Sequence, residues 1–345
     1  MGKTKENSLI DVVKFLFAIL ILFAHYAAEW GEFPTILDYA FSLYITVVPF
    51  FFACSGYFLY SKVKKGNKEE IYKNYVIRIM KLYLAWTVIY FCFKVVGWIL
   101  QGGSVSEILH YLHTSLVFTT YPTIWFLPAC AVAAVMMYFL SRKFSIKTIG
   151  VIALVLYIIG SLGYSYDFLL SGENAVFIKK VYEAYDAVFV TTRNGVFNGF
   201  PWFVLGCLVS EYGSKLKRHP ILYGWGSFLC LILTVAEAVI IKVKFHSSGV
   251  DTVFFLIPFI FCLMMFLIKE NIYLGCGKWM RKMSTLIFVS QRIFLTAIPT
   301  AFPAMTIILT GSSYVGAIVL LICVLLFSEL IILASNKYKI LKNLW

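Results

Sequence analysis

Three titratable groups in the first long apolar stretch of the chain are the residues most able to do chemistry: Asp11, Lys14 and His25. Because histidine titrates near neutral pH, His25 is a candidate general base. It lies 11 residues after Lys14, which is about 16 Å further along a helix. Lys14 is therefore expected near one edge of the stretch and His25 toward the other. Glu29 and Asp11 are the candidate groups to orient His25 or balance its charge.

These residues also have ordinary structural interpretations. A lysine one turn inside an apolar stretch can extend its amine to the interface, which would account for Lys14. A histidine near the far edge, like His25, can be a satisfied interfacial residue. Both interpretations stay open beside the functional one, because ionisable groups inside an apolar helix are costly and usually face a polar interior.

A second candidate group consists of Arg78 and Lys81, at the start of a later apolar run. Their i, i+3 spacing places both on one face of a helix. Arginine and lysine bind phosphate oxygens, so the pair predicts a site for the phosphates of a donor molecule. The alternative is a positively charged flank that only sets membrane topology.

Other candidates are spread along the chain. Arg193 and Asn194 precede a further apolar run and supply a cation and a turn, and Trp125 begins another run. Trp125 by itself suits an interfacial aromatic belt. Ser55 and Gly56 are small enough to let a helix or a thin substrate approach closely.

Composition indicates which elements position these residues. Of 345 residues, 61% are hydrophobic and 14% are charged, whereas soluble domains are nearer half and a quarter. About 210 apolar residues suffice for about ten membrane spans. We therefore predict an all-α polytopic membrane protein that forms a single domain over residues 1–345, with no large extramembrane domain. The expected helices are 10–28, 41–60, 76–100, 123–140, 147–164, 195–211, 221–242, 251–268, 284–303 and 308–334.

The charge distribution predicts the orientation of these spans. The net charge is +13, and most lysines and arginines fall in alternate loops, as the positive-inside rule requires if both termini are cytoplasmic. The excess charge is thereby explained by topology, and no basic-aromatic motif indicates nucleic-acid binding. The polar segment 1–11 leads directly into the first span, which we expect to be retained rather than cleaved.

Neither cysteines nor histidines indicate a metal. Most of the eight cysteines lie in apolar runs without a CxxC pair, so they are expected to be buried hydrophobes rather than disulfides or ligands. His110 and His113 have a ligand spacing but lack an evident third ligand, and we place them in an outer loop. The longest outer segment, 165–194, is the external piece large enough to shape an acceptor site.

These features together resemble the membrane acyltransferase-3 family, and also the membrane domain of the vancomycin-resistance serine racemases. The resemblance covers most of the chain and depends on the order of its parts. Those parts are Ile10-Asp11 with Lys14-x10-His25, the Phe-Phe-x-x-Ser-Gly-Tyr run ending at Tyr57, Arg78-x-x-Lys81, Ile124-Trp125-Phe126-Leu127, and Thr192-Arg193-Asn194-Gly195 before Pro201 and Gly206.

The chain departs from the family pattern at three positions. Lys14 and Lys81 stand where the family has arginine, which keeps the charge but loses bidentate geometry. Late in the chain, Gln291 takes a place where the family often has histidine.

The resemblance implies an O-acyltransferase in the plasma membrane. The donor would be cytoplasmic acyl-CoA, most simply acetyl-CoA, and the acceptor a hydroxyl of a cell-surface or exported glycan. His25 would be the base, while Lys14, Arg78 and Lys81 would hold the donor phosphates. Arg193, Asn194 and Trp125 would contact the acceptor or an oxyanion. No metal is implied, and the oligomeric state, a dimer included, is left open. Two alternatives remain: a transporter of an amino acid such as serine or of a glycan, and a non-catalytic membrane partner.

Overall fold

The computed structural model describes residues 8–30, 42–216, 219–247, 249–270, 272–301, 306 and 313–345. Across these residues the regular structure is helical and no strand occurs, which confirms the all-α class. The chain divides into two compact units, one of residues 1–47, 81–124 and 271–345, the other of residues 48–80 and 125–270. Helix α4 (Lys68–Gln101) contributes to both. The prediction of a single domain over 1–345 stays a prediction.

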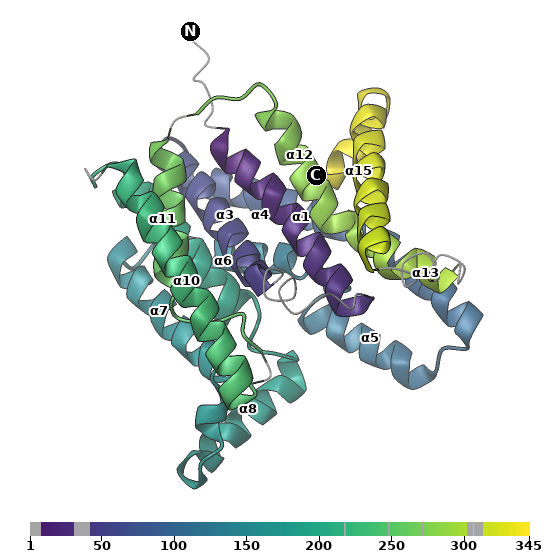
Figure 1. Cartoon of the computed structure of the whole chain (residues 1–345), viewed down its shortest axis with the longest axis horizontal. Coiled ribbons are helices and arrows are strands. Elements are labelled where there is room, and N and C mark those ends of the chain that lie inside the picture. Colours follow the sequence, from purple (N-terminus) through teal and green to yellow (C-terminus); the bar gives the residue numbers. More distant parts are fainter. Residues whose placement is uncertain are drawn as a thin grey trace. The chain divides into compact units, whose positions relative to one another are not determined.

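The first unit is built around α1 and α12, which lie side by side (Figure 1). Asp11 lies in the first turn of α1. At the other end of this helix, the backbone N–H of the C-cap residue Trp30 donates a hydrogen bond to the carbonyl oxygen of Tyr26. Beyond α12 the helical path continues through a π-helical turn into a short helix. The described elements of this unit besides α4 are α1 (Leu9–Glu29), η1 (Ser42–Thr46), α5 (Val105–Val117), α12 (Gly277–Arg292), η5 (Ile293–Ala297), α13 (Ile298–Ala301), α15 (Ser313–Lys337) and η6 (Lys339–Leu344).

The second unit contains the paired helices α10 and α11 and a group in which α6 and α7 pack on α9 and its preceding turn (Figure 1). Its elements besides α4 are α3 (Val47–Val63), α6 (Phe126–Leu140), α7 (Ile146–Leu162), η2 (Asp167–Leu170), η3 (Glu173–Ala175), α8 (Val176–Phe189), η4 (Gly195–Gly199), α9 (Phe200–Tyr212), α10 (Pro220–Phe245) and α11 (Leu256–Lys269).

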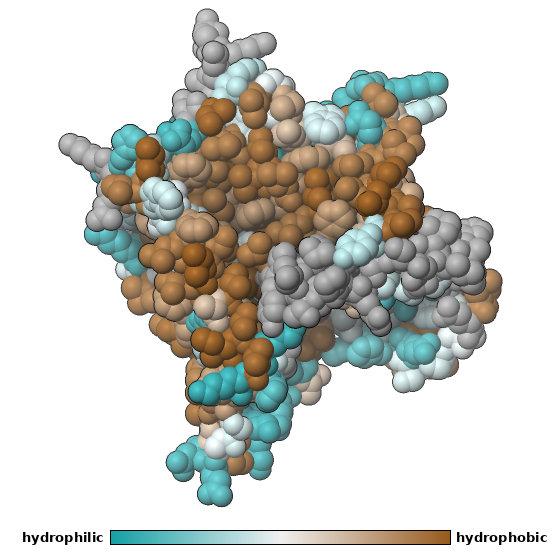
Figure 2. Space-filling model, viewed as in Figure 1, coloured by the Kyte–Doolittle hydropathy of each residue, from teal (hydrophilic) through white to brown (hydrophobic). Residues whose placement is uncertain are grey.

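The protein is an integral membrane protein with several apolar helices. Five described stretches are long and apolar enough to cross a membrane: Leu9–Glu29, Leu43–Val63, Lys68–Leu100, Val105–Leu140 and Tyr314–Lys337. The fourth contains both α5 and α6, and Ile146–Leu162 and Leu256–Lys269 are shorter apolar helices. Figure 2 shows hydrophobic side chains over much of the surface in view, as expected where lipid is the solvent.

The count of ten spans stays a prediction, as does the cytoplasmic position of both termini. Several predicted spans are divided in the structure. The predicted helix at 195–211 is the π-helical turn η4 followed by α9, which has 13 residues, fewer than the about 20 that a span needs. Of the predicted helix at 284–303, residues 284–301 are likewise α12 continued by η5 and α13, and residues 302 and 303 lie outside the described part of the chain.

Two segments outside the predicted helices are also helical. His110 and His113, expected in an outer loop, lie on α5, which begins with a capping box between Ser104 and Glu107. The segment 165–194 carries η2, η3 and α8. Both α5 and α8 leave most apolar side chains exposed, so neither has the buried face of a core helix. The pattern of long apolar runs did not reveal them because they are short and amphipathic.

Two glycines allow α3 and α9 to approach closely. A Cβ at Gly56 would lie 1.9 Å from the carbonyl oxygen of Phe203, and a Cβ at Gly206 would lie 1.9 Å from that of Ala53. Ser55, next to Gly56, is half-buried on the same helix. The small residues predicted to permit close approach therefore lie against a neighbouring helix.

Replacement of Gly56 by alanine should destabilise the fold. The added methyl group would force the α3 and α9 backbones apart, at a cost of about 1–3 kcal/mol. Thermal unfolding of the purified protein in detergent measures the effect. Gly172→Ala is the matched control, because a Cβ at Gly172 meets nothing within 4 Å. Equal unfolding midpoints for the two variants would refute the interpretation.

Candidate functional site

The predicted base, His25, is held by a side chain on α12. His25 Nδ1 lies 3.0 Å from Gln291 Oε1. His25 is half-buried, whereas Gln291 is fully buried. Gln291, which stands where the resembled family often has histidine, is therefore a partner that orients the imidazole.

The hydrogen bonds of Gln291 determine which imidazole nitrogen carries the proton. Gln291 Nε2 donates to the carbonyl oxygen of Phe288 at 2.9 Å. A carbonyl can only accept, so the amide nitrogen must point to Phe288 and the amide oxygen to His25. That oxygen can only accept as well, so His25 Nδ1 is the donor. In the neutral imidazole, Nε2 then holds the lone pair that a general base needs.

One turn further along α1, an ion pair joins the same two helices. Arg292 Nη1 lies 2.8 Å from Glu29 Oε2. The side chain of Arg292 is 14% exposed, and its buried Nε has no hydrogen-bond partner among the described residues. Glu29, a candidate partner of His25, is thus paired with Arg292. The arginine retains one buried donor for a further group.

Aromatic and hydroxyl groups of the first unit pack around this end of α12. Tyr90 on α4 donates to the carbonyl oxygen of Val289. Its ring stacks on that of Tyr121 with 4.4 Å between centroids, and the Tyr121 hydroxyl lies 2.6 Å from Thr296 Oγ1. These contacts hold the chain on both sides of Gln291, at Val289 on α12 and at Thr296 on η5.

Asp11, the other predicted partner of His25, is bound elsewhere. Arg281 contacts it through two nitrogens, Nε to Oδ1 at 3.0 Å and Nη2 to Oδ2 at 2.8 Å. Asp11 lies 14 residues before His25, about 21 Å along the helix. The prediction that Asp11 orients His25 therefore does not hold: its carboxylate is buried and held by arginine at the opposite end of α1.

The predicted donor-binding cations lie on two helices. Lys14 is half-buried on α1, and Arg78 and Lys81 are exposed one turn apart on α4. The Arg78 guanidinium lies over the ring of Tyr75 at 5.8 Å. Among the described residues neither Arg78 nor Lys81 forms an ion pair with a carboxylate, so both charges remain available to an anion. Lys14 and Arg78 belong to different units.

In the second unit, Arg193 lies between an acid and two aromatic rings. Its Nη1 is 3.0 Å from Asp251 Oδ2, and its guanidinium lies 5.3 Å from the Trp125 ring centroid and 6.0 Å from that of Tyr164. Two of the predicted acceptor contacts, Arg193 and Trp125, are thus in contact.

Asn194 has a structural role instead of the predicted acceptor contact. Its Oδ1 accepts from the backbone N–H groups of Val196 and Phe197 at 2.9 and 3.2 Å, which caps the π-helical turn η4. Its Nδ2 donates to the Tyr185 hydroxyl and to the Thr191 carbonyl. These four bonds use the hydrogen-bonding capacity of the amide, so none is left for an acceptor.

The sequence analysis assigns no partner to three charged residues that form ion pairs in the structure: Arg281, Arg292 and Asp251. One pattern in the sequence could have indicated these ion pairs: two residues of opposite charge at similar depths in two different apolar runs, such as Glu29 and Arg292. Among the described residues, no group of three or more His, Cys, Asp and Glu side chains could hold a metal ion.

Comparison with known proteins gives a family match across both units. The family model described as "Acyltransferase domain" matches residues 7–339. An amino-acid racemase of Enterococcus faecalis is 25% identical over 76% of this chain and 36% of the relative. A second amino-acid racemase of that organism is 22% identical over 97% of this chain and 47% of the relative. A serine/alanine racemase of Enterococcus gallinarum is 24% identical over 61% of this chain and 30% of the relative. The chain spans less than half the length of these relatives, and no solved structure matches it.

Loss of Arg281 should destabilise the first unit. Arg281→Gln would leave the carboxylate of Asp11, whose side chain is 3% exposed, without its cation, at a cost of about 1–3 kcal/mol. Chemical unfolding in detergent measures the change. Lys278→Gln removes the same charge from an exposed position of α12 and should leave stability unchanged. An equal loss in both variants would contradict a specific role for the pair.

Proposed function

This chain belongs to the acyltransferase domain family, and we propose that it is a membrane O-acyltransferase. It would move an acyl group, most simply acetyl, from cytoplasmic acyl-CoA to a hydroxyl of a cell-surface or exported glycan. The observation that carries the proposal is the hydrogen bond between His25 Nδ1 and Gln291 Oε1, which leaves the lone pair of the imidazole on Nε2.

His25 would act twice in one turnover. Nε2 takes the proton of the acceptor hydroxyl while the oxygen attacks the thioester carbonyl carbon, and a tetrahedral intermediate forms. Collapse of the intermediate breaks the carbon–sulfur bond, and the leaving thiolate takes the proton back from Nε2. The products are the ester and the free thiol of CoA. General base catalysis of this kind is worth about 10²–10⁴ in rate.

Gln291 would orient the imidazole as the third member of catalytic triads does. An amide fills this position in some nucleophilic enzymes, so the orienting group need not be charged. Gln291 is fully buried and hydrogen-bonded to the carbonyl oxygen of Phe288, so its amide is already positioned before the reaction. Little conformational entropy is therefore lost when the reaction begins.

The donor would enter from the cytoplasmic side, which requires the predicted orientation of the spans. Lys14 lies on the same helix as His25 and about 16 Å from it, a length comparable with the pantetheine arm of CoA. Lys14, Arg78 and Lys81 would bind its phosphates as point charges or as a guanidinium fork. The proposal thus includes a ten-span bundle in the plasma membrane with both termini inside.

Arg292 is the best candidate to stabilise the oxyanion. It belongs to the same unit as His25, follows the residue that orients His25, and has a buried Nε–H without a described partner. Such donors, fixed before the reaction, are strong stabilisers of developing negative charge. Arg193, first considered for this role, is paired with Asp251. With Trp125 and Tyr164 beside it, Arg193 better suits contacts to the hydroxyls and ring faces of a sugar acceptor.

A second candidate function is the binding or transport of an amino acid such as serine. The names of the relatives, amino-acid racemase and serine/alanine racemase, favour it. The two functions differ in the first ligand. Binding of acetyl-CoA by the purified protein supports the acyltransferase, whereas serine binding without acetyl-CoA binding supports the alternative.

Substitutions of His25 and Gln291 test the base. His25→Ala should abolish transfer, because no group would remain to take the hydroxyl proton, and Gln291→Ala should lower kcat by on the order of tenfold or more, because the imidazole loses its orientation. Mass spectrometry of surface glycans from cells with and without each variant measures the acyl group. Unchanged membrane levels and unfolding midpoints are the control. Full acylation by His25→Ala would exclude the proposed mechanism.

A comparison of Arg292 with Glu29 tests the oxyanion role. Arg292→Gln should lower kcat by about 10²–10³ with little change in KM, because the donor acts only in the transition state. Glu29→Gln breaks the same ion pair but keeps the guanidinium, and should cost far less. Steady-state kinetics with acetyl-CoA measures both. Equal losses would show that the pair has only a structural role.

A further inference from the structure

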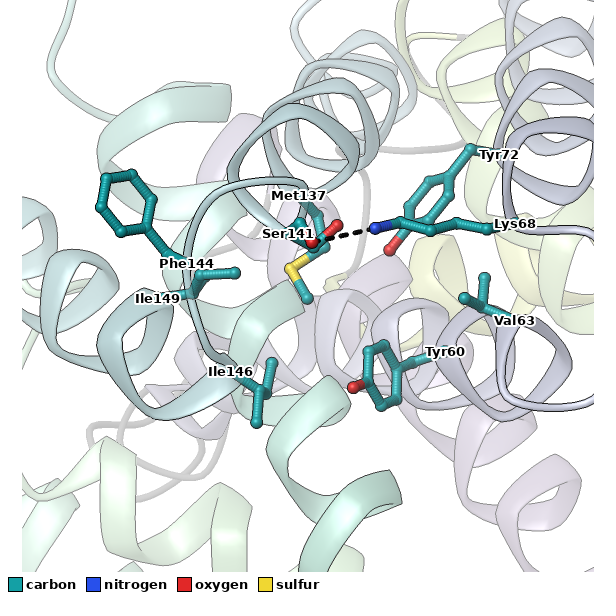
Figure 3. Close-up of a pocket in the computed structure, with 9 residues that line it drawn as sticks. All are labelled: Tyr60, Val63, Lys68, Tyr72, Met137, Ser141, Phe144, Ile146 and Ile149. Atoms are coloured by element: carbon teal, nitrogen blue, oxygen red, sulfur yellow. Dashed lines mark hydrogen bonds between the residues drawn. The ribbon is translucent and has the colours of Figure 1, made fainter.

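A pocket of about 210 Å³ lies within the second unit, where four helices begin or end. Val63 ends α3, Lys68 begins α4, Ser141 follows α6 and Ile146 begins α7. The segments that join these helices carry the lysines assigned to the cytoplasmic side by the positive-inside pattern. The lining residues are Tyr60, Val63, Lys68, Tyr72, Met137, Ser141, Phe144, Ile146 and Ile149 (Figure 3).

Lys68 and Tyr72 give the pocket a cation and a hydroxyl from one helix face. Figure 3 shows both extending from α4 toward the space beside Ser141, with the Tyr60 hydroxyl directed into the pocket from α3. Lys68 Nζ donates one hydrogen bond, 3.0 Å long, to the Ser141 carbonyl. An ammonium has three donors, so two remain for a ligand.

The hydroxyl of Tyr72 lacks a partner although it is buried. Tyr72 is 4% exposed, and its oxygen has no hydrogen-bond partner among the described residues. A buried hydroxyl without a hydrogen bond costs free energy, so a ligand atom that accepts from it would remove this cost. The hydroxyl lies beside a cation and in a pocket without an acidic lining residue, which points to a negatively charged acceptor.

The charges around the pocket are also positive. Arg142 and Lys143 follow Ser141 directly, and Lys147 follows Ile146. Lys68 forms no ion pair with a carboxylate among the described residues. Acidic residues of the neighbouring segments lie outside the lining. Glu69 and Glu70 are exposed on the first turn of α4, and Glu211 is paired with Lys64. The positive charges around the pocket would therefore attract an anion, and no carboxylate among the lining residues would repel it.

Apolar side chains line the pocket beside these donors. Phe144, Ile146 and Ile149 are among the lining residues, and Phe144 is exposed. A phospholipid combines the two requirements, because its phosphate is anionic and its acyl chains need an apolar surface. A free phosphate would use the polar end alone and leave Phe144, Ile146 and Ile149 without contact.

We propose that this pocket binds the phosphate headgroup of an anionic phospholipid, with Lys68 and the Tyr72 hydroxyl as the donors and the apolar lining residues Phe144, Ile146 and Ile149 against its acyl chains. This binding is independent of acyl transfer. It would anchor the ends of α3, α4, α6 and α7 to the inner leaflet.

The test compares three probes on the purified full chain in detergent: dioleoyl phosphatidylglycerol, dioleoyl phosphatidylcholine and inorganic phosphate. Native mass spectrometry measures the bound fraction of each lipid, and inorganic phosphate is added as a competitor. Phosphatidylglycerol should bind at least about tenfold more tightly than phosphatidylcholine, and phosphate should not displace it. Equal affinity for the two lipids would overturn the proposal, as would displacement by phosphate at the same concentration as the lipid.

Variants assign the preference to this pocket. Lys68→Ala and Tyr72→Phe should each lower the phosphatidylglycerol affinity, the first by about tenfold, because a charge-assisted hydrogen bond is lost. Tyr72→Phe keeps the ring and breaks no described bond, so it should fold like the parent protein. Lys65→Ala is the control, since it removes the same charge from an exposed position three residues before Lys68. An equal loss in Lys65→Ala, or full affinity in both pocket variants, would overturn the assignment.

Discussion

The proposed chemistry depends on the pairing of α1 with α12. In a bilayer a buried polar side chain without a partner is costly, so each polar group on α1 has to meet one on the helix beside it. Asp11 meets Arg281 near one end, and His25 meets Gln291 near the other. Contacts at two well-separated depths fix both the register and the rotation of α1. The same geometry sets the proton of His25 on Nδ1, so the packing constraint and the proposed catalytic state have one origin.

His25 could be identified from the sequence because a titratable group stands out in an apolar span. Its partner could not, since 266 positions separate the two side chains and no local spacing connects them. Gln291 was visible only as a departure from a family pattern, and its orienting role required the geometry of α12. Long apolar runs predicted most helices, yet the π-helical turns within two of them were missed, because hydrophobic periodicity does not register one additional residue in a turn.

The adjacent residues Arg193 and Asn194 show why candidate sites need structure as well as residue type. Both are polar, both lie at the end of the segment 165–194 that is predicted to be external, and both are predicted acceptor contacts. The backbone turn that begins η4 directs the Asn194 amide back onto its own chain, where every bond is used. Arg193 instead reaches Asp251, 58 positions later in the chain. Two adjacent residues thus have different roles: Asn194 caps a helical turn, whereas the side chain of Arg193 is able to contact a ligand.

The neutral partner of His25 also has an electrostatic consequence. A carboxylate in the place of Gln291 would be a buried anion before the hydroxyl proton is transferred, when the imidazole is still neutral, and burial of an unpaired charge is costly. With an amide the site starts uncharged. In the proposed reaction, proton transfer creates an imidazolium and an oxyanion together, as opposite charges, and Arg292, which is balanced by Glu29, adds a donor. The net charge of this group is therefore the same before and during the reaction, which is the arrangement that an apolar surrounding favours most.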